Sequence, residues 1–210
     1  MSLRSTLLAA VAVVGMSTAA FAVPVSGQIS LGGFAQANGS VGMGGATGIS
    51  FANASGSSVS GTSGVLTSFG AGSGAFAALG ACSSTTTGCG TIKNISSFAT
   101  ATPTTAFLTL SNGSGSGAAV TFDLTSLTSV TRTQDNLGGS LTFTAAGLIN
   151  YAGYDATAGQ FILTAQGNNI VSFSATTLAA NTAVPEPMSL ALLGGGLAAV
   201  GFIRRKRHSA

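Results

Sequence analysis

The chain is poor in the side chains that usually perform chemistry or carry charge. It has no tryptophan, two tyrosines, two cysteines and one histidine, and 5% of its 210 residues are charged. The histidine, His208, stands near the C-terminus, so residues 23–184 contain none. A Ser-His-Asp triad and a His-containing zinc site are therefore excluded from that stretch. We predict a non-enzymatic protein with no catalytic residue, no metal and no cofactor.

The formal net charge of +3 is unevenly distributed along the chain. Five of the seven basic residues stand near the ends, as Arg4 and as the cluster at 204–207. Between the ends, Lys93 and Arg132 oppose three aspartates, so residues 23–184 carry a net charge of −1. No basic face is available to neutralise phosphates, which excludes a nucleic-acid partner. A surface with so few charges suits a secreted or matrix-embedded protein better than a crowded cytosolic one.

The N-terminus has the three parts of a secretory signal peptide. Arg4 makes the first region positive, 7–14 is apolar, and Ala20-Phe21-Ala22 supplies a small-x-small cleavage site. We predict a signal peptide over residues 1–22, cleaved between Ala22 and Val23. The alternative is an N-terminal membrane helix that stays uncleaved.

The C-terminal segment, residues 184–210, contains a short rigid motif, an apolar run and a basic cluster, in that order. The motif is Pro185-Glu186-Pro187, the uncharged run covers 188–203, and the cluster is Arg204, Arg205, Lys206 and Arg207. A 16-residue helix is about 24 Å long, short of a hydrocarbon core of about 30 Å, but the basic side chains extend its reach. We predict a thin transmembrane helix at 188–203, with the cluster as a cytoplasmic stop signal. An ordinary tail anchor is the alternative.

Residues 183–208 resemble the PEP-CTERM sorting signal of Gram-negative bacteria in motif, order and position. The resemblance implies recognition of Pro185-Glu186-Pro187 by an exosortase, a membrane-embedded protease that cleaves near the motif. It further implies a precursor held transiently in the inner membrane and then delivered to the cell surface or to an extracellular polysaccharide matrix. Such systems accompany exopolysaccharide and biofilm production, so we expect a structural role there.

The body, residues 23–183, shows the alternation typical of strands. Between residues 28 and 80 we expect two or three strands with glycine-rich turns, and a flexible segment at 56–74. Residues 38–90 are rich in glycine and serine, and we expect them to be partly flexible. Beyond them we predict strands at 91–98, 105–110, 120–124, 127–133, 141–151, 161–165 and 171–175, with turns at 112–113, 134–139 and 153–159. Short alternating strands without amphipathic helices predict an antiparallel β-sandwich or a similar all-β module. Its expected core is Phe107, Phe122, Leu124, Phe143, Phe161 and Phe173.

Cys82 and Cys89 are separated by six residues. In an exported protein such a pair predicts a disulfide that closes a small loop and contributes about 2–3 kcal/mol. A redox or metal pair is the alternative, but it would need a Cys-x-x-Cys spacing or further ligands.

The remaining candidate residues are acidic, aromatic or amide side chains. Asp123, Asp135 and Asp155 are candidates for an acid pair, and Asp135 with Asn136, or Asp155, for calcium. The simpler interpretation is that Asp135 and Asp155 cap turns. Carbohydrate binding uses exposed aromatics and amides, and five of these stand close in sequence: Tyr151, Tyr154, Gln166, Asn168 and Asn169. The alternative function is therefore a glycan-binding, calcium-assisted β-sandwich module.

Overall fold

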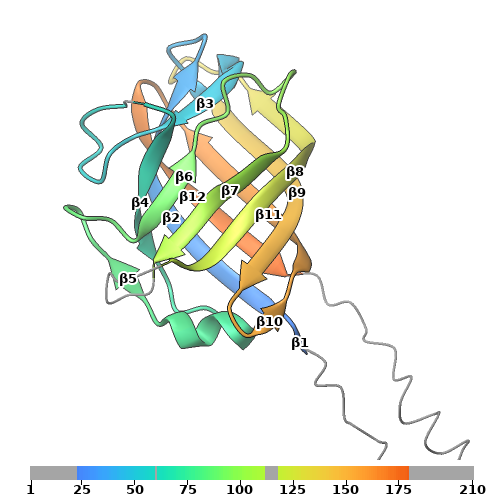
Figure 1. Ribbon diagram of the computed structural model, residues 1–210. Coiled ribbons are helices and arrows are strands. Elements are labelled where there is room, and N and C mark those ends of the chain that lie inside the picture. Colours follow the sequence, from blue (N-terminus) through green and yellow to red (C-terminus); the bar gives the residue numbers. More distant parts are fainter. Residues whose placement is uncertain (1–22, 60, 112–117, 180–210) are drawn as a thin grey trace, which may run out of the picture. The chain divides into compact units, whose positions relative to one another are not determined.

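The computed structural model describes residues 23–59, 61–111 and 118–179, and the regular secondary structure of these residues is almost all strand (Figure 1). The strands are β1 (Val23–Pro24), β2 (Gly27–Asn38), β3 (Gly48–Phe51), β4 (Ser63–Phe69), β5 (Cys82–Ser83), β6 (Gly90–Lys93), β7 (Thr104–Ser111), β8 (Ala118–Thr133), β9 (Ser140–Tyr151), β10 (Tyr154–Asp155), β11 (Thr157–Gln166) and β12 (Ile170–Ala179). Two short 3-10 helices, η1 (Met43–Gly45) and η2 (Gly74–Leu79), complete the described elements.

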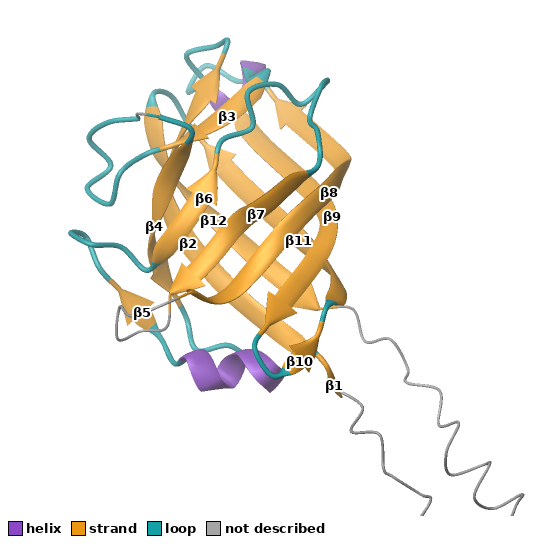
Figure 2. Cartoon of the chain, in the orientation of Figure 1, coloured by secondary structure: helices purple, strands orange, loops and turns teal. Residues whose placement is uncertain are grey.

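The sheet closes into an antiparallel barrel, as Figure 2 shows. The hydrogen-bonded order is β2-β12-β11-β9-β8-β7-β6-β4, and β4 pairs back onto β2. The predicted all-β class is confirmed, but the two-sheet sandwich is wrong. A ring of eight strands is just wide enough for its interior to be filled by side chains.

The closing strand β2 has a pair of glycines where it pairs with β4. Its register with β4 shifts between Gly32 and Gly33, a β-bulge. A Cβ at Gly33 would lie 2.8 Å from Cε1 of Phe173 and 3.2 Å from the carbonyl oxygen of Val65. Because only glycine leaves room for this approach, β2 can bend and pair with β4 on one side and β12 on the other.

Phenylalanine side chains fill the barrel interior. All six predicted core residues are buried. The ring of Phe161 lies at the centre of a cluster, with centroid distances of 5.5 Å to Phe107, 5.8 Å to Phe143 and 6.1 Å to Phe122. Such aromatic contacts add to the stabilisation from apolar burial, which is the main energetic contribution to this fold.

The region from about residue 28 to residue 80 contains three strands, β2, β3 and β4, in agreement with the two or three expected. Strand β4 and the start of η2 lie within residues 56–74, where we expected a flexible segment. The predicted disulfide is confirmed: Cys82 and Cys89 are bonded, with their Cα atoms 5.8 Å apart. It closes the loop between β5 and β6.

Three details of the later strands differ from the predictions. The expected strand at 91–98 is shorter, because β6 ends at Lys93. The expected strands at 120–124 and 127–133 are one strand, β8, interrupted by two register shifts. At these bulges the hydroxyls of Thr125 and Thr128 donate to the carbonyls of Ala146 and Thr144 on β9, at 2.9 and 3.1 Å, and so keep the strands together. The predicted turn at 153–159 is also too long, because the chain reverses at residues 152–153 and continues as β10 and β11.

Several predictions fall outside the described residues. These are the signal peptide with Ala22, the turn at 112–113, the motif Pro185-Glu186-Pro187, the apolar run at 188–203 and the basic cluster at 204–207. Within the described ranges, none of the helices has the length and hydropathy needed to cross a bilayer.

Candidate functional site

An open cleft of about 340 Å³ lies at the end of the barrel where β9 stops. Tyr151 and Tyr154 line it, and their rings stack with centroids 5.1 Å apart and an angle of 14° between the ring planes. Residues 152–153 form the turn between them, and Gly153 has a φ of +88°, which suits glycine. Since a turn brings its first and fourth residues together, this short sequence alone pairs the two rings.

The N-terminal residues of the body hold this end of the barrel in place. Strand β1 runs parallel to β10, with Val23 opposite Tyr154. The amide of Val25 donates to the buried hydroxyl of Thr157 at 2.8 Å, and that hydroxyl donates to the carbonyl of Asp155, also at 2.8 Å. Tyr154 is therefore fixed through its backbone, although the residue is 36% exposed.

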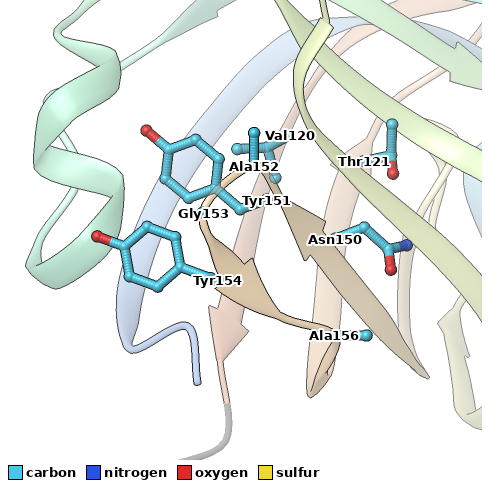
Figure 3. Close-up of a pocket in the computed structure, with 8 residues that line it drawn as sticks. All are labelled: Val120, Thr121, Asn150, Tyr151, Ala152, Gly153, Tyr154 and Ala156. Atoms are coloured by element: carbon cyan, nitrogen blue, oxygen red, sulfur yellow. The ribbon is translucent and has the colours of Figure 1, made fainter. Parts of the chain in front are cut away.

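Polar side chains line the cleft on the other side of β9. Thr121 of β8 and Asn150 of β9 are opposite each other in register, and both line the cleft. Figure 3 shows the two tyrosine rings on one side of the strand and Asn150 with Thr121 on the other. The cleft thus passes around the end of β9, with an aromatic part and an amide and hydroxyl part.

Asp123 fixes the orientation of the Asn150 amide. The Asn150 Nδ2 donates to Asp123 Oδ2 at 2.9 Å, while Asp123 Oδ1 accepts the backbone N–H of Ala106 at 2.6 Å. Ala106 has a φ of +48°, at a bulge of β7 that this carboxylate stabilises. With Nδ2 held by the carboxylate, the amide oxygen of Asn150 is left as an acceptor for a ligand hydroxyl.

Neither Lys93 nor Arg132, the two cations of the body, lines the cleft. The Lys93 ammonium donates to the carbonyl of Thr105 at 2.6 Å. The Arg132 guanidinium lies 5.5 Å from the centroid of the Phe98 ring, towards the opposite end of β8. Asp155 is exposed in β10, close to the cleft. The side chains around the cleft are therefore neutral or negative, and the one cation near it is the α-amino group that the predicted cleavage leaves on Val23, opposite Tyr154.

The structure separates the five residues that we predicted as one sugar-facing patch. Tyr151 and Tyr154 lie before the start of β11, whereas Gln166, Asn168 and Asn169 lie at or beyond its end. Ten residues of strand span about 30 Å, so the amides are at the opposite end of the barrel. There, Asn168 pairs with Gly42 in an isolated bridge. The prediction of a single patch is wrong, and only its aromatic half belongs to the cleft.

The three aspartates do not form a common site. Asp135 caps its own turn as expected, because its Oδ1 accepts the amides of Leu137 and Gly139, both at 2.8 Å. Asp155 is in β10 rather than in a turn closed by Gly159, because the chain reverses earlier, at residues 152–153. Asp135 and Asp155 stand near opposite ends of β9, and Asp123 makes the contacts with Ala106 and Asn150 described above. Among the described residues no three His, Cys, Asp or Glu side chains gather as metal ligands.

Sequence reasoning missed Thr121 and Asn150 as cleft residues. The alternation of buried and exposed residues could have shown that both side chains point outward. Thr121 stands between the buried Val120 and Phe122, and Asn150 stands beside the buried Ile149. Their register across β8 and β9, which brings them together, could not be read from the sequence.

Comparison with known proteins finds one family match. Residues 183–207 match the model of the PEP-CTERM protein-sorting motif. Neither the curated proteins nor the solved structures contain a significant match.

Proposed function

We propose that this chain, a protein with a PEP-CTERM sorting signal, is a non-enzymatic structural component of the cell surface or of an extracellular polysaccharide matrix. The sorting motif implies an exported protein that is processed by a membrane-associated exosortase. That motif at 183–207 is the observation that carries the proposal. The destination beyond the membrane and the structural role are inferred from the body.

The disulfide supports export, because such bonds persist in oxidising compartments outside the cytosol. The outer surface of the barrel is further evidence for a location in a hydrated, uncharged environment. Threonine and serine side chains form a row across four neighbouring strands, from β8 through β9 and β11 to β12: Thr131, Thr142, Thr164 and Ser174. A surface of hydroxyls with few charges is compatible with the hydroxyl-rich surface of a polysaccharide.

Sorting is tested by changing Glu186, the only glutamate of the chain. Glu186→Ala should leave a membrane-bound precursor of full C-terminal length, seen by fractionation and by mass spectrometry of the intact protein. Asp155→Ala is the matched control, since it removes one exposed carboxylate from the body and should be processed normally. Release of mature Glu186→Ala protein at the wild-type level would refute exosortase processing. The same spectra test whether the mature chain begins at Val23.

Glycan binding is the second candidate function, and the stacked tyrosine pair favours it. Aromatic rings partly exposed at the mouth of a cleft, beside an oriented amide, are the groups with which proteins bind sugars. The calcium-assisted form of this hypothesis has less support, because both carboxylate oxygens of Asp123 and one of Asp135 already accept hydrogen bonds within the protein.

A further inference from the structure

We propose that the cleft around the end of β9 binds the interior of a neutral polysaccharide chain. Tyr154 would provide a stacking face, and Asn150 with Thr121 would provide hydrogen bonds to sugar hydroxyls. The inference rests on the export proposed above, since free polysaccharide is met outside the cell.

The shape of the cleft favours a chain over a single sugar. It is open, and its aromatic and polar parts lie on two sides of one strand (Figure 3). One monosaccharide would contact only one of these parts. An extended chain laid across the strand end would contact both, with one sugar ring against Tyr154 and a neighbouring one against Asn150.

The polar part of the cleft has hydrogen-bonding groups that are already oriented to bind sugar hydroxyls. Because Asp123 holds the Nδ2 of Asn150, the amide does not need to be ordered when a ligand arrives, which lowers the entropic cost of binding. The Thr121 hydroxyl both donates and accepts, as sugar hydroxyls do.

Charge selects against acidic polysaccharides. Neither body cation lines the cleft, and Asp155 and Asp123 are close to it. At the amide part a uronate or sulfate group would meet no cationic side chain and would be repelled by the Asp123 carboxylate. At the aromatic part the predicted cleavage leaves one α-ammonium, on Val23 opposite Tyr154, and the exposed Asp155 carboxylate beside it opposes that charge. Neutral hexose chains carry no such penalty.

The composition of the chain supplies a direct probe. Tyr151 and Tyr154 are the only tyrosines, and there is no tryptophan, so ultraviolet emission excited in the tyrosine band comes from the cleft alone. The exported protein is titrated with dextran, hydroxyethyl cellulose and galactomannan as neutral probes and with alginate as the acidic one. We expect a saturable change in tyrosine emission with at least one neutral polysaccharide, no change with alginate, and the same result with a chelator present.

Variants then assign the contacts. Asn150→Ala keeps both fluorophores and should weaken binding about tenfold, as expected for the loss of a hydrogen bond to an oriented group. Tyr154→Phe keeps the ring face and should retain near wild-type affinity, read from Tyr151, whereas Tyr154→Ala should lose about tenfold or more. Leu137→Ala, an exposed apolar side chain at the other end of β9, is the matched control and should bind as the wild type does. Thermal unfolding of each variant confirms that it is folded.

The proposal is overturned if no neutral polysaccharide changes the emission, if alginate changes it equally, if the chelator abolishes the change, or if Asn150→Ala and Tyr154→Ala bind like the wild type. None of these results bears on processing at Glu186. A failure of the glycan site and a failure of the sorting proposal are therefore distinguishable.

Discussion

Two buried threonines at one end of the barrel should respond in opposite directions to the same substitution. Thr177 of β12 is 1% exposed and lies between Phe161 and Ile29 in register, and its hydroxyl has no hydrogen-bond partner among the described residues. Thr157 of β11 is 3% exposed, but its hydroxyl accepts from the Val25 amide and donates to the Asp155 carbonyl.

Valine has nearly the shape of threonine with a methyl in place of the hydroxyl. At Thr177 the change removes an unpaired polar group, which costs about 1–3 kcal/mol when buried, and adds apolar burial. Taking the lower end of that range, Thr177→Val should stabilise the body by about 1–2 kcal/mol. For a domain of this size that raises Tm by about 2–8 °C. Thr157→Val should instead destabilise it by about 1–3 kcal/mol, because the Val25 N–H is left buried without its acceptor.

Thermal and denaturant unfolding of the two variants, with the disulfide intact, measures both effects. The linear-extrapolation slope m should stay unchanged, so that shifts in the midpoint report stability. The reasoning is refuted if Thr177→Val destabilises the protein as much as Thr157→Val does. That result would mean that the Thr177 hydroxyl is hydrogen-bonded after all.

Three further predictions concern stability. Replacing both Cys82 and Cys89 by serine opens the small loop before β6 and should lower the free energy of unfolding by about 2–3 kcal/mol, whereas wild-type stability in the double variant would contradict the loop-entropy argument. Asp123→Ala removes the acceptor of the Ala106 and Asn150 hydrogen bonds and should cost about 1.5–3 kcal/mol in denaturant unfolding, with a smaller loss for Asp123→Asn. Gly33→Ala places a methyl against the Phe173 ring and should destabilise the barrel by about 1–3 kcal/mol. Gly70→Ala is the matched control, because the added Cβ meets nothing within 4 Å and the backbone is outside the positive-φ region, so its stability should stay close to that of the wild type.

Local patterns in the sequence predicted the strands and the core because each depends on near neighbours. Alternation along β9 and β11 placed Phe143 and Phe161 inside, and the structure has both buried. Closure of the barrel depends instead on the pairing of β2 with both β4 and β12, and these two partners stand far apart from each other in the sequence. A sandwich and a barrel share the same alternation, so the pattern could not distinguish them.

The candidate site was half predictable for the same reason. Tyr151 and Tyr154 are three residues apart across a glycine, so a turn suffices to pair them. Asn168 is also near them in sequence, but the length of β11 separates it from the tyrosines. Asn150 and Thr121 meet only through the register of β8 with β9. Two bulges in β8 shift this register, and the sequence does not show by how many residues.

Ring closure limits how copies of the body can associate. Within the described ranges, the backbone groups of the eight barrel strands are directed to neighbours in the same molecule. The flanking strands offer little template: β5 has two residues, and the outer side of β3 exchanges hydrogen bonds with Ile95 at 2.8 and 2.9 Å. Growth by adding strands from further copies, the route to amyloid-like fibres, is thereby disfavoured. In a matrix, copies of the body would therefore remain separate folded units that make contacts through their side chains, and would not join into a continuous β-sheet fibre.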